Sequence, residues 1–370
     1  MLKRTCIEVF NNKLHSMIRI IDNIDALRNF QDDWNEIYSN SINPTPFQAY
    51  DYVYNAWDYV SNHAKQLHII VYIRQKDKAV LGVAPCYVDN KNALRFINDI
   101  HTDFCDIIVR SDAIADYHMW SEISDSILSC NSIKRVNLIN LRPKSYLTSN
   151  LRYFLSPSFV YSNNAYTCCT LSHIDASQPV TDALMFLRSK ERARLKNVYT
   201  KINADQLCVY DVHKGESFPS QLVTDVIKQM VDSGWRTYQY FNESMIMLFR
   251  SLYDAGLLQI HLTKKDNSIL AANFWLYDKG NTEYIDWIAI YTDKERNLDN
   301  LLQSIHYIAQ QGGMVNFGRG TYKYKMHNFR PQIYNLYTLR WSKSLWGQIG
   351  DLFAMNLYHI KQIIKKIIRK

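Results

Sequence analysis

One acidic residue stands inside an apolar segment, where a carboxylate could act on a substrate proton. Asp286 lies between Ile285 and Trp287 in the run Thr282–Ile290, whose β-branched and aromatic residues are typical of a strand. Successive strand side chains point to opposite faces, so we expect Asp286 and Glu283 on opposite faces of a sheet. A carboxylate that faces the interior has a raised pKa and can serve as a general base. The alternative is a hydrogen bond to a neighbouring strand or an ion pair with a lysine.

A second group of reactive side chains follows a short strand nearer the end of the chain. The segment Gly318–Lys325 reads GRGTYKYK, and its glycines permit close approach of the backbone. In extended conformation its tyrosines and lysines alternate between opposite faces. We expect Tyr324 to act as a proton donor and Lys325 to bind a phosphate or carboxylate, with Arg319 beside them. The alternative is a solvated edge strand.

The remaining candidates are substrate-binding residues. They are Asp103, Lys190, Arg192, Trp235 and Arg236. Lys190 and Arg192 belong to a basic helix predicted over residues 182–202, whose i, i+4 cations repel one another unless an anion lies between them. Trp235 and Arg236 form either an aromatic wall with an anion clamp or a helix end packed on the core. Asp103, with Asp106, is a candidate for holding an amine or a sugar hydroxyl.

The histidines and cysteines show no spacing typical of a metal site or a catalytic triad. The 11 histidines are scattered, and we predict that they are ordinary core or surface residues. The 7 cysteines form no CxxC pair and lie mostly in apolar runs, which is typical of reduced thiols. We therefore predict neither a metal nor a disulfide.

Length and charge indicate a globular protein of two domains. The chain has 370 residues, 47% of them hydrophobic, and a net charge of +8 that is dispersed except at the C-terminus. Such a length favours two domains of roughly 150–200 residues. The dispersed charge argues against a DNA-binding protein and suits a small anionic ligand. Because no signal peptide and no apolar run of ~18–20 residues occur, we expect the protein in the cytoplasm.

The predicted elements follow the same order in both halves of the chain. Each half reads helix–helix–hairpin–strand–helix–strand, with hairpins over Leu67–Val88 and Leu257–Asp278. This order favours an α/β fold with mixed sheets. We divide the chain into an N-terminal domain (residues 1–160), a C-terminal domain that carries the candidate site (residues 161–344) and a C-terminal helix (residues 345–370).

The C-terminal helix is basic and amphipathic. From Leu345 to Lys370, apolar residues recur at three- and four-residue spacing, with lysines and an arginine on the other face. Such a helix either lies on the inner face of an anionic membrane or packs across the protein's own body.

Several of these stretches resemble the CelD-like group of GNAT-superfamily acetyltransferases, named for cellulose biosynthesis, and more distantly the FemAB-type transferases. The similar pieces are Pro46-Phe47 with Trp57, Gly82–Pro85, Asp103-x-x-Asp106, Lys190–Lys196, and Phe317–Gly320 followed by Tyr324-Lys325. The resemblance spans about residues 40 to 341. It implies tandem GNAT-like domains that transfer an acyl group from a thioester to an amine, with Asp286 as base and Tyr324 as the acid for the leaving thiolate.

One segment departs from the family's pattern. GNAT enzymes usually hold the cofactor pyrophosphate with an Arg/Gln-x-x-Gly-x-Gly/Ala loop at a helix start, because glycines let backbone N–H groups approach the phosphates. The equivalent segment here is Lys294–Asn300, KERNLDN, which has no glycine. Arg296, Asn297 and Asn300 are the candidates for binding acyl-CoA such as acetyl-CoA, whereas nearby carboxylates oppose it. An acyl carrier protein or an aminoacyl-tRNA is the alternative donor.

The resemblance therefore leads us to expect an N-acyltransferase. Its expected acceptor is a small-molecule amine such as an amino sugar, in polysaccharide or cell-envelope precursor synthesis. The alternatives are a FemAB-like transferase that uses aminoacyl-tRNA and an inactive GNAT-like binding protein.

Overall fold

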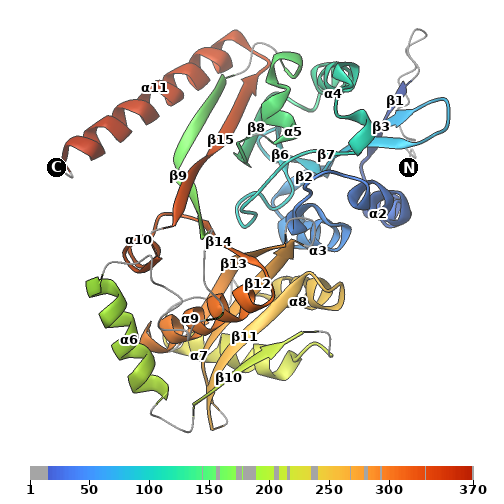
Figure 1. Cartoon of the computed structure of the whole chain (residues 1–370). Helices are drawn as coiled ribbons and strands as arrows, with labels where there is room; N and C mark the ends of the chain where they lie inside the picture. Colours follow the sequence, from blue (N-terminus) through green and yellow to red (C-terminus); the bar gives the residue numbers. More distant parts are fainter. Residues whose placement is uncertain are drawn as a thin grey trace. The chain divides into compact units, whose positions relative to one another are not determined.

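The chain folds into two compact units (Figure 1). The first unit consists of Met1–Asn164 and Asn335–Lys370, and the second of Ala165–Tyr334. The computed structural model describes residues 16–143, 145–155, 159–171, 177, 189–203, 208–214, 217–234, 241–266, 268–278, 282–291, 294–329 and 331–368.

The segment after residue 334 belongs with the first unit, whereas we assigned it to the second domain as far as residue 344. Strand β15 (Gln332–Ser342) pairs in antiparallel fashion with β8 (Arg135–Leu141). Two of its side chains, Leu339 and Trp341, are buried in the core of the first unit. Apolar burial in that core therefore fixes the place of this strand.

The first unit contains a four-stranded antiparallel sheet in the order β1-β3-β4-β7. Its strands are β1 (Ser16–Ile21), β3 (Ile69–Arg74), β4 (Val80–Ala84) and β7 (Ile108–Val109). Further strands of this unit lie in the order β15-β8-β6-β5-β2, with β6 and β8 parallel. The remaining bounds are β2 (Ala64–Leu67), β5 (Cys86–Asp89) and β6 (Ala93–Phe96).

The hairpin predicted over Leu67–Val88 is divided between these two sets of strands. The strand structure is interrupted at His68, between β2 and β3, and at Pro85, between β4 and β5. Proline has no N–H to donate to a ladder, so it ends β4. The backbone N–H of His68 donates to the carbonyl of Cys86 at 3.0 Å, which holds the two crossing points together.

The helices of the first unit that precede residue 150 bury apolar residues in its core. They are α1 (Ile24–Arg28), α2 (Gln31–Ser39), α3 (Tyr50–Ser61), α4 (Tyr117–Ser129) and α5 (Tyr146–Ser149), with 3₁₀ turns at Pro46–Gln48, Ser111–Ala113 and Leu151–Tyr153. The unit ends with helix α11 (Leu345–Ile368). In α4, Met119, Trp120, Ile123 and Ile127 are buried at helical spacing. Asp116 caps this helix by accepting from the N–H of His118.

The second unit has a mixed sheet in the order β10-β11-β12-β13-β14-β9. Its strands are β9 (Phe159–Leu171), β10 (Cys208–His213), β11 (Leu258–Lys265), β12 (Ser268–Asp278), β13 (Glu283–Tyr291) and β14 (Met314–Arg319). Its helices are α6 (Ser189–Asn203), α7 (Ser220–Asp232), α8 (Glu243–Asp254), α9 (Lys294–Gln310) and α10 (Lys323–Phe329). Among the strand pairs described for this sheet, β13 and β14 are parallel and the others are antiparallel. The parallel pair is connected by α9 as a crossover helix.

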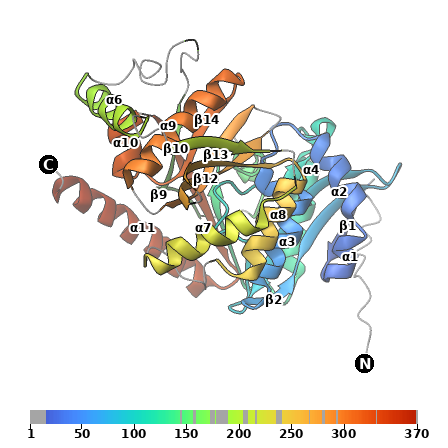
Figure 2. The same ribbon diagram turned by 90° about the horizontal axis from the view of Figure 1, so that it is seen from below.

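Helices cover both faces of this sheet, as Figure 2 shows with α9 on one side and α7 and α8 on the other. Phe274 and Trp275 are neighbours in β12, so they point to opposite faces. Trp275 packs with Leu301 and Ile305 of α9. Phe274 stacks on Phe249 of α8, with 4.8 Å between ring centroids. The sheet is therefore buried on both faces.

Among the described helices, none combines the length and the apolar character that crossing a bilayer requires.

Candidate active site

The candidate site lies where β13 and β14 separate. The two strands pair only at Glu283–Ile285 with Met314–Asn316. Beyond these residues, β13 stays paired with β12 as far as Tyr291. Strand β14 pairs with β9 as far as Arg319, with a register shift between Asn316 and Arg319. Neighbouring strands that pair with different partner strands move apart. The side chains at this point therefore face the space between β13 and β14.

A β-bulge on β13 lies at the same place. Phe274 of β12 is opposite Ile288 and Trp275 is opposite Asp286, so Trp287 is the extra residue. A bulge bends its strand and redirects the adjacent side chains. Asp286 is therefore located both at the bulge and at the first position beyond the pairing with β14.

Asp286 is turned toward the interior, with 8% of its surface exposed. Its Oδ1 accepts a hydrogen bond from Nδ2 of Asn273 on β12 at 3.3 Å. The sequence analysis offered a proton-accepting carboxylate and a carboxylate bonded to a neighbouring strand as alternatives. The structure shows the second contact, and a proton-accepting role is compatible with it because a carboxylate has further acceptor sites.

Lys325 and Tyr324 belong to a helix, α10, and not to the extended segment that we considered. Lys325 is 3% exposed, and its Nζ donates to the carbonyl oxygens of Phe317 and of Arg319, the latter at 3.3 Å. Tyr324 is 38% exposed and stacks on Tyr322. Because residues of a helix are about 100° apart around its axis, the two side chains leave in different directions and do not alternate across a strand.

Two buried asparagines that the sequence analysis did not single out hold this region together. Asn273 donates to Asp286, as described above. Nδ2 of Asn316 donates to Oε1 of Glu283 at 3.0 Å and to the Tyr334 hydroxyl at 3.1 Å, and its Oδ1 accepts from the N–H of Gly318. Both are polar residues inside otherwise apolar strand sequences, and that interruption is the signal by which they could have been found.

The expected donor-binding segment forms the first turns of α9, which begins at Lys294. Asn300 is buried and donates through Nδ2 to the carbonyl of His261 and to Oγ1 of Thr263, at 3.2 and 3.1 Å. These bonds tie α9 to β11. Arg296 and Asn297 are half-buried. Asn300 is therefore engaged in holding the helix to the sheet.

A buried carboxylate lies beside these residues. Asp299 is 2% exposed, and its Oδ1 has no hydrogen-bond partner among the described residues. Burial raises its pKa to about 7, and the nearby Arg296 only partly opposes this shift. A carboxylate in the first turns of a helix is an unfavourable neighbour for a pyrophosphate when it is ionised.

The basic helix α6 packs against α9 and α10. Leu195 is buried in the core of the second unit, and Nη2 of Arg194 contacts Oδ1 of Asn328 on α10. Lys190 is exposed and Arg192 is half-buried. The structure thus brings α6 to the helix that carries Lys325, while Trp235 and Arg236 lie outside the described residues.

The first-unit candidates have a different environment. Asp103 is buried in that unit. Asp106 accepts from three backbone N–H groups, those of Ile107, Tyr146 and Leu147, at 2.9, 2.8 and 3.1 Å. It therefore accepts from the first N–H groups of α5, whose N-cap residue is Ser145. A role of Asp103 and Asp106 in holding an amine or a sugar hydroxyl stays a prediction.

Among the residues that the structure describes, no three His, Cys, Asp or Glu side chains are grouped as metal ligands would be. His261 is fully buried, and its Nδ1 lies 2.8 Å from the hydroxyl of Tyr210. Burial lowers the pKa of this imidazole to about 3, so it is neutral. It is a core histidine, as we predicted.

No known family model matches the chain, and no curated protein matches it. Several solved structures resemble the chain in fold. A conserved protein of unknown function from Bacteroides thetaiotaomicron VPI-5482 has a TM-score of 0.55 at 10% identity, over 87% of this chain and 99% of its own. L-PGS from Bacillus licheniformis has a TM-score of 0.54 at 12% identity, over 85% of this chain and 93% of its own. FemX has a TM-score of 0.55 at 8% identity, over 84% of this chain and 95% of its own.

At this level of identity the likenesses show the fold. The chain has a mixed α/β, tandem GNAT-like fold, which confirms the fold expected from the resemblance. Its grouping with the CelD-like enzymes stays a prediction.

Proposed function

We propose that the chain is an N-acyltransferase that moves an acyl group from a thioester donor to an amine, such as that of an amino sugar in polysaccharide or cell-envelope precursor synthesis. The observation that carries the proposal is the separation of β13 from β14 directly after Ile285. A thioester that lies along this edge of β13 can accept hydrogen bonds from main-chain amides. Such donors stabilise the oxyanion of a tetrahedral intermediate.

Asp286 is the proposed base. The amine nitrogen forms a bond to the acyl carbon and its proton passes to the Asp286 carboxylate, after which the carbon–sulfur bond breaks. The departing thiolate takes a proton from Tyr324 or from water. The hydrogen bond from Asn273 fixes the orientation of the carboxylate, and orientation is the larger part of what general-base catalysis requires.

Lys325 serves the site mainly through the main chain in this proposal. Its ammonium group binds the carbonyls of Phe317 and Arg319, both on the part of β14 that lies beyond the pairing with β13. These bonds hold the end of β14 in its own direction and so keep the strands apart. The third N–H of the ammonium group can serve an anion of the acceptor.

The surroundings of α9 indicate which class of acyl donor the protein can bind. Asn300 is engaged with β11, and Asp299 lies buried next to it. Both observations weaken the binding of a CoA pyrophosphate at this helix. They favour, as a second candidate, an aminoacyl-tRNA donor, which needs no pyrophosphate site there; an acyl carrier protein is a third.

The test measures turnover with each donor class. Acetyl-CoA and longer acyl-CoAs are supplied with amino sugars, and thiol release is followed; in parallel, transfer from aminoacyl-tRNA is followed with a labelled amino acid. We expect turnover with one donor class, and we expect Asp286→Asn to lower kcat by at least about a hundredfold. Asp266→Asn, in the exposed β11–β12 turn, is the matched control and should keep the wild-type rate.

Each outcome has a definite meaning. A wild-type rate in Asp286→Asn removes this residue from the mechanism. Transfer from aminoacyl-tRNA alone replaces the donor but keeps the site. A folded protein that turns over none of these donors overturns the transferase proposal.

A further inference from the structure

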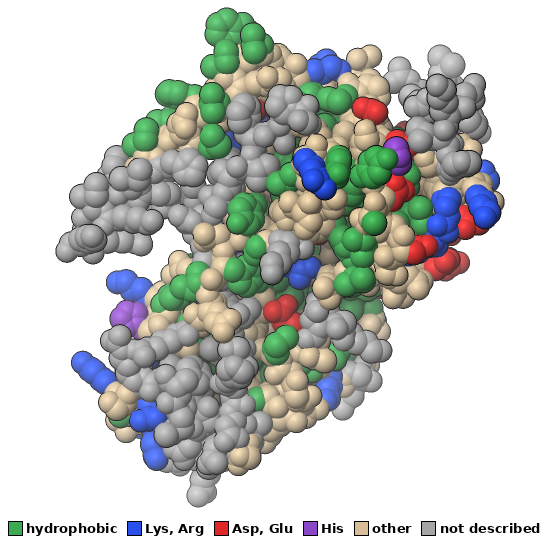
Figure 3. Space-filling view, turned by 45° about the horizontal axis from the view of Figure 1, so that its top comes forward, with side chains coloured by type: hydrophobic (Ala, Val, Ile, Leu, Met, Phe, Trp, Pro, Cys, Tyr) green, Lys and Arg blue, Asp and Glu red, His purple; other side chains and the backbone are tan. Residues whose placement is uncertain are grey.

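The C-terminal helix α11 turns its large apolar side chains to solvent. Trp346 is 82% exposed and Phe353 is 64% exposed. The other exposed apolar residues of this helix are Leu345, Ile349, Leu352, Leu357 and Ile360. Figure 3 shows hydrophobic side chains along the outer edge of the molecule where α11 lies.

The opposite face of α11 makes the contacts with the first unit. Oδ2 of Asp351 accepts from Oγ of Ser342 at 2.5 Å, and Nε2 of Gln348 donates to the carbonyl of Ser342 at 3.1 Å. Ala354 and Met355 are half-buried. A surface helix normally packs its apolar stripe on the core and shows its polar face to water. In α11 the large apolar side chains lie instead on the face that is not packed.

The exposed apolar residues form one continuous stripe. At 3.6 residues per turn, the positions from Leu345 to Ile360 fall within an arc about 140° wide. The same spacing continues in the sequence through Ile363, Ile364 and Ile367. With 24 residues, α11 is about 36 Å long. Single exposed apolar residues are ordinary, but a stripe of this length marks an interaction surface.

The charge of this segment identifies the partner. From residue 345 onward the basic residues are Lys361, Lys365, Lys366, Arg369 and Lys370, and the acidic residue is Asp351. Asp351 is hydrogen-bonded to Ser342 on the packed face, and the five cations outnumber this one carboxylate. A long apolar stripe combined with an excess of lysines matches a surface of hydrocarbon edged by phosphates.

We propose that α11 lies in the interface of an anionic phospholipid bilayer and holds the protein on the membrane surface. Its apolar stripe enters the boundary between headgroups and acyl chains, and its lysines contact lipid phosphates. Trp346, at the start of the helix, has the amphipathic ring that favours the headgroup level. This inference is independent of the transferase proposal.

The test is co-sedimentation of the full chain with vesicles. We expect binding to equimolar phosphatidylcholine and phosphatidylglycerol, weaker binding at high salt, and little binding to phosphatidylcholine alone. Trp346→Ser/Phe353→Ser should lower the partition coefficient at least about tenfold. Lys361→Glu/Lys365→Glu should lower it at least about tenfold on the anionic vesicles.

The control is Met247→Ser/Ile333→Ser, which removes two exposed apolar side chains, each 51% exposed, from other elements. It should bind vesicles as the wild type does. Equal thermal unfolding of all variants shows that they fold. The proposal is overturned if the folded wild type does not sediment with anionic vesicles, or binds neutral ones equally well. It is also overturned if the chain is a dimer in solution that Trp346→Ser/Phe353→Ser dissociates, since the stripe is then covered by a second copy.

Discussion

Asp106 in the first unit and Asp299 in the second are both buried carboxylates, but they differ in the hydrogen bonds that their oxygens accept. Asp106 accepts from three backbone N–H groups. Oδ1 of Asp299 has no partner among the described residues. Burial raises the pKa of Asp106 to about 6, against the opposing backbone bonds, and that of Asp299 to about 7.

The difference shows that burial alone does not give a carboxylate a role. Asp106 organises a turn, because its oxygens satisfy N–H groups that would otherwise be buried without partners. Asp299 organises nothing of this kind, and its ionisation works against folding. A residue that is kept at such a cost, in the expected donor-binding segment of α9, is a better sign of function than one whose hydrogen bonds are all made locally.

The largest effect is expected from Asp299→Asn. A carboxyl whose pKa rises on folding contributes stability at low pH and loses it as the pH rises from its unfolded pKa to its folded pKa, here from about 4 to about 7. The neutral amide removes this loss, so the variant should exceed the wild type by up to about 4 kcal/mol at pH 8 and not at pH 4. Urea unfolding at both pH values measures it; a gain that does not depend on pH contradicts the assignment.

Asp106→Ala is expected to act in the opposite direction. Three backbone N–H groups lose their acceptor, at about 1 kcal/mol each, so the free energy of unfolding should fall by about 3 kcal/mol. The same urea titration checks this at pH 4, where the raised pKa of Asp106 adds no ionisation cost to the wild type. If the variant is as stable as the wild type, the three bonds do not hold α5 and the comparison with Asp299 fails.

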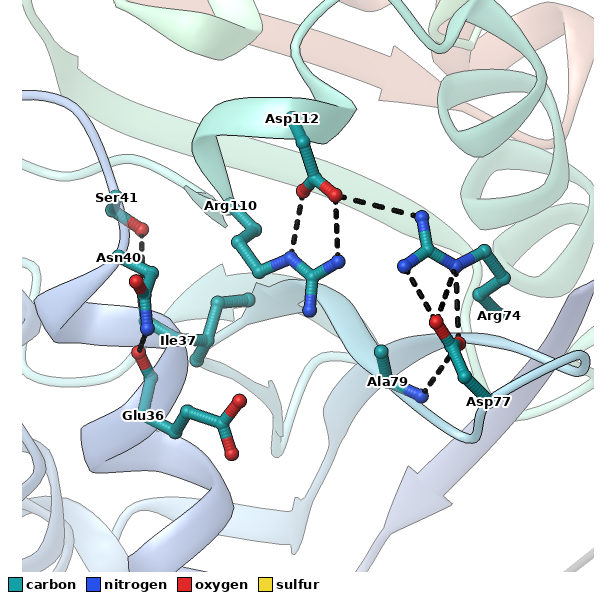
Figure 4. A network of polar contacts seen from close by, with 9 residues as sticks. All are labelled: Glu36, Ile37, Asn40, Ser41, Arg74, Asp77, Ala79, Arg110 and Asp112. Atoms are coloured by element: carbon teal, nitrogen blue, oxygen red, sulfur yellow. Dashed lines mark hydrogen bonds and ion pairs between the residues drawn. The ribbon is translucent and has the colours of Figure 1, made fainter.

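The smallest effect is expected for an exposed carboxylate. Asp112 pairs with Arg110 through two contacts of 2.7 Å and with Arg74 at 3.5 Å (Figure 4). These side chains reach solvent, so Asp112→Ala should cost no more than about 1 kcal/mol, and less in high salt. A cost as large as that of Asp106→Ala would mean that the number of contacts, and not burial, decides the energy.

Much of the second unit was predictable from the sequence. The hairpin over Leu257–Asp278 and the strand over Thr282–Ile290 correspond to β11, β12 and β13, because each reads as a β-rich run between turn residues. Helix α9 starts at Lys294. The glycine-free segment that we compared with a cofactor-binding loop is therefore itself helical.

The candidate site was only partly predictable. Asp286 stood out as a charge in an apolar strand, and its burial follows from that pattern. The helix that carries Lys325 did not stand out, because Gly318 and Gly320 directly before it favour a loop. The partners of Lys325 are main-chain carbonyls eight and six residues away. The pattern of side chains in a sequence does not show which backbone carbonyls lack a hydrogen-bond donor.

The return of the chain through β15 has a consequence for biosynthesis. The second unit is one continuous stretch, whereas the first is completed only when Tyr337–Ser342 pair with β8. A ribosome therefore makes the nested unit in full before the outer one has all its strands. We expect the nested unit to fold first and the outer unit to wait for the synthesis of residues 335–342.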